Sequence, residues 1–128
     1  MAYTVMVVDD SETIRAILER SLRMTKLPID AIIHAGNGME ALEKLRDQWV
    51  DIVFSDIHMP EMNGTMLVNA MREDPGLRAV PIVIVSTEGS TTRIEELKKM
   101  GVRGYLRKPF TPEDIRDTII STLGAWDG

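Results

Sequence analysis

Five short apolar runs alternate with five longer segments of helical pattern along this chain of 128 residues, and this alternation constrains the fold most strongly. The run at 81–85 is continuously apolar and rich in β-branched residues, as is typical of a strand covered on both faces. We predict strands at 4–8, 30–35, 51–55, 81–85 and 103–106, with 30–35 at an edge. Alternating βα units indicate parallel strands joined by right-handed crossovers. The sequence therefore predicts an α/β fold, (βα)5, which is a doubly wound five-stranded parallel sheet with helices on both faces.

Helix start and stop signals lie between these runs. Ser11 is a candidate N-cap, and apolar residues follow it at helical spacing: Ile14, Ile17, Leu18 and Leu22. The second helix opens at Asn37-Gly38, the third includes 66–71 and stops near 74–76, the fourth covers 90–100, and the last begins at Thr111-Pro112. The length fits one domain, so we expect a single domain over 1–128 with no output domain.

Composition excludes several classes of protein. Apolar residues make up 44% of the chain and charged residues 27%, which is ordinary for a globular protein. The net charge is -5 and no stretch concentrates Lys and Arg, so the footprint of a nucleic-acid-binding protein is missing. There is no cysteine, which excludes disulfides and thiolate sites. No signal peptide or membrane-spanning run is present in the sequence, so we expect a cytoplasmic protein without membrane insertion.

Polar side chains follow four of the five predicted strands. Asp9 and Asp10 follow the first, Asp56 the third, Ser86 and Thr87 the fourth, and Lys108 the fifth. Ligands of an open parallel sheet bind outside the carboxyl ends of its strands. We therefore expect three carboxylates, a hydroxyl group and an ammonium group at one edge, a set that suits a divalent metal ion and a phosphoryl group.

The three carboxylates indicate a cation site. Neighbouring carboxylates repel one another and lose solvation when buried, so a cation has to compensate them. Mg²⁺ is the natural candidate because it is a hard ion that takes oxygen ligands. We expect Asp9 and Asp10 to diverge from one strand end, so that at least one binds the ion directly and the other through water. Asp56 would complete the site, and Lys108 would place a fixed positive charge opposite.

The reactive atom is expected to be a carboxylate oxygen. Cysteine is missing, and His34 and His58 have no serine and acid arranged around them. A carboxylate can act as a nucleophile and form an aspartyl phosphate. Asp56 is the best candidate because it ends a central, predominantly apolar strand, and Ser86 can donate a hydrogen bond to the phosphoryl group. Phosphoryl transfer requires mainly positioning and charge neutralisation, which this set provides.

The motifs as a whole resemble the receiver domain of two-component response regulators, of the stand-alone, CheY-like type. The resemblance covers essentially the whole chain and rests on four segments in order: Val7-Val8-Asp9-Asp10-Ser11, Ser55-Asp56-Ile57-His58-Met59-Pro60-Glu61-Met62-Asn63-Gly64, Val85-Ser86-Thr87-Glu88 and Gly104-Tyr105-Leu106-Arg107-Lys108-Pro109-Phe110. It implies the strand order 2-1-3-4-5. It also implies a phosphorylation-activated signalling switch rather than an enzyme, with phosphorylation from small donors and self-catalysed dephosphorylation as intrinsic activities.

The resemblance assigns roles at the predicted site. Asp56 would accept the phosphoryl group from a phosphohistidine of a sensor histidine kinase. Asp10 would bind Mg²⁺, Asp9 would position the ion, and the backbone carbonyl of His58 would be a further ligand. Lys108 would contact the phosphoryl group.

The resemblance also implies how the signal leaves the site. Ser86 would turn toward the phosphoryl group, Tyr105 would move from an exposed to a buried position, and the Pro109 peptide bond would be cis. The surface of the fourth helix, the fifth strand and the fifth helix would then change for a downstream partner, such as a flagellar motor switch in chemotaxis. We expect the protein to be a monomer.

Three positions near the site depart from the family's commoner residues or vary within it. Thr87 stands where a small residue is frequent, so its side chain would narrow access to Asp56. His58 and Glu88 lie where side chains modulate hydrolysis of the acyl phosphate. We therefore expect Thr87, His58 and Glu88 to set the lifetime of the phosphorylated state.

Two alternatives remain open from the sequence. A Mg²⁺-dependent phosphohydrolase could use Asp56 as its nucleophile, although Asp56-Ile57-His58 lacks the second acid of the D-x-D-x-T pattern. A small nucleotide-binding domain is the other, because Gly36-Asn37-Gly38-Met39-Glu40-Ala41 fits the dinucleotide fingerprint. It follows the weak second strand rather than the first, which disfavours that alternative.

Overall fold

The computed structural model describes residues 2–87 and 91–124, and strands alternate with helices throughout this part of the chain. The strands are β1 (Tyr3–Val8), β2 (Ile29–Ala35), β3 (Ile52–Asp56), β4 (Ile82–Ser86) and β5 (Gly104–Arg107). The helices are α1 (Glu12–Met24), α2 (Gly38–Asp47), α3 (Gly64–Glu73), α4 (Thr91–Lys99) and α5 (Pro112–Leu123). The strands form one parallel sheet in the order β2-β1-β3-β4-β5, so the predicted fold class and strand order are confirmed.

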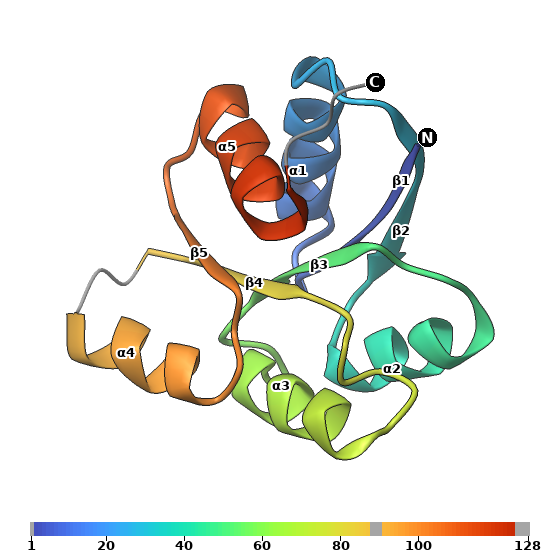
Figure 1. Cartoon of the computed structure of the whole chain (residues 1–128), viewed down its shortest axis with the longest axis vertical. Helices are drawn as coiled ribbons and strands as arrows, with labels where there is room; N and C mark the ends of the chain where they lie inside the picture. Colours follow the sequence, from blue (N-terminus) through green and yellow to red (C-terminus); the bar gives the residue numbers. More distant parts are fainter. Residues whose placement is uncertain (1, 88–90, 125–128) are drawn as a thin grey trace.

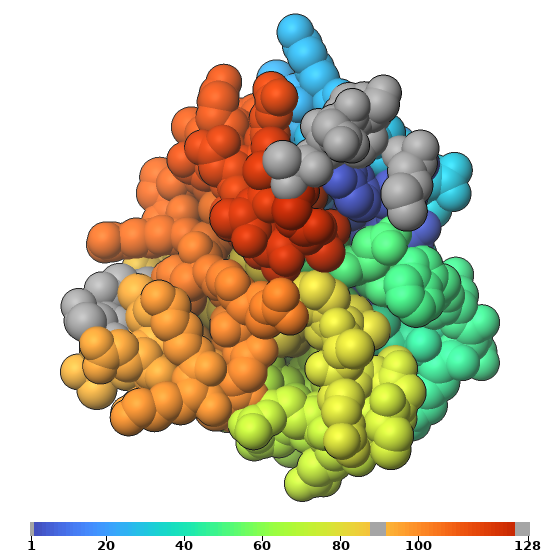
Figure 2. All heavy atoms as spheres, in the orientation of Figure 1, coloured from blue at the N-terminus to red at the C-terminus, as the bar shows by residue number. Residues whose placement is uncertain are grey.

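The helices cover both faces of the sheet. Helices α1 and α5 lie on one face, and α2, α3 and α4 lie on the other (Figure 1). Side chains alternate along a strand, so each strand contributes to both layers. In β1, Val5 and Val7 pack with the α1 and α5 side, whereas Met6 and Val8 pack with the opposite side. With all atoms drawn, α3, α4 and α5 and their connecting loops hide most of the sheet from view (Figure 2).

Polar side chains cap the helices where the sequence predicts helix starts. The Ser11 hydroxyl accepts the backbone N–H of Ile14, and Thr111 forms a reciprocal capping box with Asp114. Gly101, just after α4, has a positive φ of 104°, a backbone conformation that favours glycine. The two N-caps fix where α1 and α5 start and therefore where the loops that precede them turn.

One apolar residue does not lie where the helical pattern suggests. In α1, Leu18 and Leu22 are buried, but Ile17 is 47% exposed. Leu18 and Leu22 lie about 40° apart around the helix, whereas Ile17 lies about 100° from Leu18 and about 140° from Leu22, at the edge of the face that packs on the sheet. In the ranges 2–87 and 91–124, no helix is both long and apolar enough to cross a membrane.

Candidate functional site

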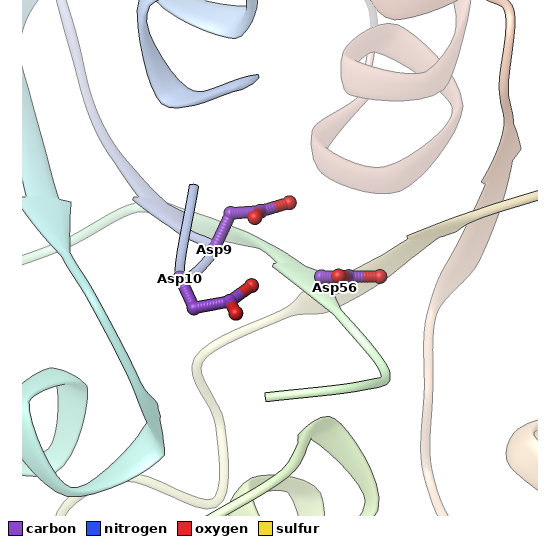
Figure 3. Close-up of side chains that lie close together, drawn as sticks. All are labelled: Asp9, Asp10 and Asp56. Atoms are coloured by element: carbon purple, nitrogen blue, oxygen red, sulfur yellow. The ribbon is translucent and has the colours of Figure 1, made fainter. Parts of the chain in front are cut away.

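The carboxyl ends of β1 and β3 bring three carboxylates together. Asp9 follows β1 directly, and Asp56 is the last residue of β3. Because Val8 pairs with Ser55 in the parallel ladder, Asp9 and Asp56 leave neighbouring strands at the same level. One carboxylate oxygen from each of Asp9, Asp10 and Asp56 lies within 4.8 Å of the other two (Figure 3). Oxygen ligands of one Mg²⁺ lie about 3 to 4 Å apart, so small side-chain adjustments suffice for this set to hold the ion.

The two adjacent aspartates do not diverge in the way the strand pattern predicts. Both carboxylates extend toward the side on which Asp56 lies (Figure 3). The alternation of side chains ends with β1, because the chain turns there and Asp9 Oδ1 accepts the backbone N–H of Ser11 at 2.9 Å. Asp9 is only 3% exposed and forms the inner wall of the cluster, whereas Asp10 is exposed.

The cluster carries an electrostatic cost when no cation is bound. Burial raises the pKa of the Asp9 carboxyl group above its usual value, and the negative charges of Asp56 and Asp10 act in the same direction. The Ser11 N–H and the Lys108 ammonium group oppose this effect without outweighing it. A bound divalent cation would relieve both the repulsion and the cost of burial.

Lys108 supplies the positive charge that the sequence predicts at this edge. Its Nζ lies 3.6 Å from Asp9 Oδ2, and its side chain is 21% exposed. The Lys108 N–H donates to the Ser86 carbonyl at 2.9 Å, which ties the end of β5 to the end of β4. The peptide bond between Lys108 and Pro109 is cis, as the resemblance implies.

Asp56 is held by the chain on both sides of it. Its Oδ1 accepts the backbone N–H of Ile57 at 2.8 Å, and its main-chain carbonyl accepts the Ser55 hydroxyl at 2.9 Å. The N–H of Gly64 donates to the Ile57 carbonyl at 2.8 Å. A Cβ at Gly64 would lie 2.4 Å from the Asp56 carbonyl oxygen, so this position requires glycine. The sequence gives no reason for a glycine here, because the close approach exists only in three dimensions.

Of the remaining predicted residues, Ser86, Thr87 and His58 lie at or just after the carboxyl ends of β3 and β4. Ser86 is buried at the end of β4, one residue beyond the Asp56–Val85 pair, and Tyr105 is half-buried in β5. Thr87 and His58 are exposed in the loops after β4 and β3. Glu88 lies outside the described residues.

Comparison with known proteins identifies the family. The model of the response regulator receiver domain matches residues 5–120. This chain belongs to that family. The chemotaxis protein CheY homolog of Campylobacter jejuni is 37% identical to this receiver over 124 residues, which are 96% of this chain and 94% of that protein. The chemotaxis protein CheY1 of Helicobacter pylori is 38% identical over 124 residues, which are 95% of this chain and 98% of that protein.

A solved structure agrees with the receiver fold. The chemotaxis protein CheY4 of Vibrio cholerae superposes with a TM-score of 0.85 at 33% sequence identity, covering 95% of this chain and 99% of that one. Family membership gives this receiver a signalling phosphoacceptor role, and its three aspartates form an acidic pocket able to hold a metal ion.

The glycine-rich segment before α2 has a packing role in this receiver. The Gly38 N–H donates to the Met62 carbonyl at 3.0 Å, so it is already used. A Cβ at Gly38 would lie 2.6 Å from Met62 Cγ and 2.8 Å from the Met62 carbonyl oxygen. The glycine thus lets the loop after β3 pack on the start of α2. A dinucleotide-binding loop needs free N–H groups facing a phosphate, so this contact disfavours the nucleotide alternative.

Proposed function

We propose that this receiver accepts a phosphoryl group on Asp56 from the phosphohistidine of a sensor histidine kinase, with Mg²⁺ as cofactor. The observation that carries the proposal is the grouping of Asp9, Asp10 and Asp56 within 4.8 Å, with Lys108 3.6 Å from Asp9. Such a set of charges can hold a divalent cation beside one carboxylate that remains available to react.

Each residue of the cluster has a step in the proposed transfer. An Asp56 oxygen attacks the phosphorus, the P–N bond breaks with its electron pair going to the imidazole nitrogen, and a mixed anhydride forms on Asp56. Asp10 and Asp56, with the His58 backbone carbonyl, would hold Mg²⁺, and Asp9 would position the ion. Mg²⁺ supplies positive charge to the phosphoryl oxygens when bound. Lys108 leaves Asp9 and contacts the phosphoryl group, and later attack by water at phosphorus releases phosphate and restores the carboxylate.

The signal leaves the site through Ser86 and Tyr105 in our proposal. Ser86 donates its hydroxyl to the phosphoryl group, and Tyr105 moves inward from its half-buried position on β5. Next to Tyr105, between β5 and α5, lies a hollow of about 570 Å³ that Lys108 and Pro109 also line. Lys108 and the part of the proposed partner surface on β5 and α5 therefore line the same hollow. Phosphorylation changes partner binding only through contacts that differ between the two states, and this region supplies them.

We assign the switch to chemotaxis because relatives that cover nearly all of this chain are named chemotaxis proteins. The downstream partner in this proposal is a protein such as the flagellar motor switch.

Intact mass spectrometry tests the phosphoacceptor. The chain is incubated with acetyl phosphate and Mg²⁺, which also tests phosphorylation from a small donor. We expect a gain of one phosphate that disappears in Asp56→Asn and persists in Asp51→Asn, a matched change before β3. Equal labelling of wild type and Asp56→Asn would remove Asp56 from the role. Steady phosphate release from generic phosphomonoesters would instead favour the phosphohydrolase alternative.

We propose that Thr87, His58 and Glu88 set the lifetime of the acyl phosphate. Thr87 and His58 are exposed in the two loops that flank the end of β3, where water reaches Asp56. Removing a side chain that shields the phosphoryl group opens it to water, so Thr87→Ala is expected to shorten the lifetime several-fold. A dephosphorylation rate unchanged in both Thr87→Ala and His58→Ala would remove these residues from the role.

A further inference from the structure

Arg15, on the first turn of α1, contacts the backbone of the acidic cluster. Its Nη1 donates a hydrogen bond to the main-chain carbonyl of Asp9 at 2.6 Å. This carbonyl belongs to the peptide unit that joins Asp9 to Asp10. Because a peptide unit is planar and includes the Cα atoms of both residues, holding its carbonyl restricts where the Asp9 and Asp10 side chains can begin. Arg15 therefore binds the backbone between the two aspartates rather than a carboxylate group.

The guanidinium group is itself oriented by β2. Arg15 Nε donates to His34 Nδ1 at 3.3 Å, and His34 Nε2 lies 2.6 Å from Glu19 Oε1. Since Nδ1 accepts from Arg15, the ring proton is on Nε2, which donates to Glu19. The chain Glu19–His34–Arg15 therefore connects α1 and β2 to the Asp9 carbonyl.

The segment between β2 and α2 borders the same guanidinium group. Nη1 of Arg15 lies 3.8 Å from the position that a Cβ at Gly36 would occupy. The charge of Arg15 is also among the influences that lower the pKa of Glu40, after the hydrogen bonds from Lys44 and Gly36. The hydrogen bonds to the Asp9 carbonyl and to His34 hold the Arg15 side chain in this orientation.

We propose that Arg15, oriented by His34 and Glu19, is a positioning residue that holds the Asp9–Asp10 peptide in the geometry needed for the metal site. The inference rests on the proposed function in one respect, that the cluster binds Mg²⁺. The direction in which Mg²⁺ affinity changes when Arg15 is replaced distinguishes a positioning role from a simple effect of charge. Arg15 is a cation near a cation site, so on charge alone its removal strengthens Mg²⁺ binding. Loss of positioning weakens it.

The test compares Arg15→Met with Arg20→Met by titration calorimetry of the full chain with MgCl₂. Arg20 is exposed on the same helix, and its replacement removes the same charge. Residues that orient metal ligands typically contribute about 10-fold to 100-fold in metal affinity. We expect binding about 10-fold weaker in Arg15→Met and within about 2-fold of wild type in Arg20→Met. Arg15→Lys, which keeps one donor to the carbonyl, is expected to recover part of the loss.

A second readout needs no metal. Amide hydrogen exchange at Asp10 and Ser11 in the Mg²⁺-free chain is expected to accelerate in Arg15→Met and not in Arg20→Met. If Arg15→Met fails to fold, His34→Phe takes its place, because it removes the acceptor that orients Arg15; weaker Mg²⁺ binding in that variant supports the proposal.

The outcomes separate this inference from the proposed function. Equal or tighter Mg²⁺ binding in Arg15→Met, with unchanged exchange, overturns the positioning role and leaves the proposed function in place. Failure of the unaltered chain to bind Mg²⁺ overturns the proposed function, and the exchange rates then decide whether Arg15 holds the peptide.

Discussion

At the scale of single residues, Asp9 is subject to opposing electrostatic effects. Its carboxylate is almost fully buried beside two other carboxylates, and burial with repulsion raises its pKa. The Ser11 N–H and Lys108 offset only part of this cost. Without a bound cation, the three carboxylates therefore lower the stability of the folded protein. The same three carboxylates give the site its affinity for a divalent cation.

Replacement of Asp9 by Asn is expected to raise the stability of the Mg²⁺-free protein. Asn keeps the shape and an oxygen that can accept the Ser11 N–H, but it removes the buried charge. We expect a gain of roughly 1 kcal/mol in the free energy of unfolding, within the usual range for one substitution. Urea unfolding with EDTA and with MgCl₂ measures this gain and the stabilisation by Mg²⁺, which is expected to shrink in the variant. Asp117→Asn, an exposed change in α5, is the control. A variant less stable than wild type in EDTA would contradict this account of Asp9.

At the scale of elements, the site depends on how α2 packs on the loop after β3. That loop carries His58 and connects Asp56 to α3. Met62 of the loop packs on Gly38 and accepts its backbone N–H. The start of α2 therefore supports the site without contributing a side chain to it.

Replacement of Gly38 by Ala is expected to displace this loop. The added Cβ would meet Met62 backbone and side chain below 3.0 Å, so the chain has to shift. Overpacking of this kind typically costs about 1–3 kcal/mol. We expect that loss in urea unfolding together with slower phosphorylation by acetyl phosphate. Gly76→Ala is the control, because its Cβ would meet only the end of the Asp74 side chain at 3.3 Å. Wild-type stability in Gly38→Ala would show that the contact is unimportant.

Glu40, in the first turn of α2, gives the chain a stability that depends on pH. Its pKa is lowered mainly by the hydrogen bond from Lys44, and then by the N–H of Gly36. A carboxyl group with a lowered folded pKa stabilises the protein above its unfolded pKa, and this stabilisation is lost as pH falls through the folded pKa. Because the pair is partly exposed, Glu40→Gln is expected to lose about 0.2–0.5 kcal/mol at pH 7.

Urea unfolding of wild type and Glu40→Gln as a function of pH measures this contribution. The difference is expected to be full at neutral pH, to begin shrinking near the usual Glu value of 4.5, and to vanish below the folded pKa. Glu43→Gln, an exposed change in the same helix, is the control. If the difference in free energy of unfolding between wild type and Glu40→Gln grew as the pH falls, the pKa of Glu40 would be raised in the folded protein rather than lowered.

At the scale of the whole molecule, periodicity in the sequence predicts most of the architecture. The apolar runs at the start of β3 and β4 indicate central strands. The polar residues at and after the strand ends indicate the site, because parallel strands end at one edge of the sheet. The direction of Asp10 is set by a turn that strand alternation does not describe. Gly38, Gly64 and Arg15 act on residues brought near only by folding, so local pattern cannot assign their roles.

The most direct test of the central claim is a crystal structure grown with Mg²⁺ and beryllium fluoride, which mimics a phosphoryl group on a carboxylate. We expect trifluoroberyllate on Asp56, a metal ion bound by Asp10 and Asp56, and Lys108 Nζ turned from Asp9 toward a fluorine atom. Density for the metal away from these aspartates, or fluoroberyllate on another side chain, would contradict it.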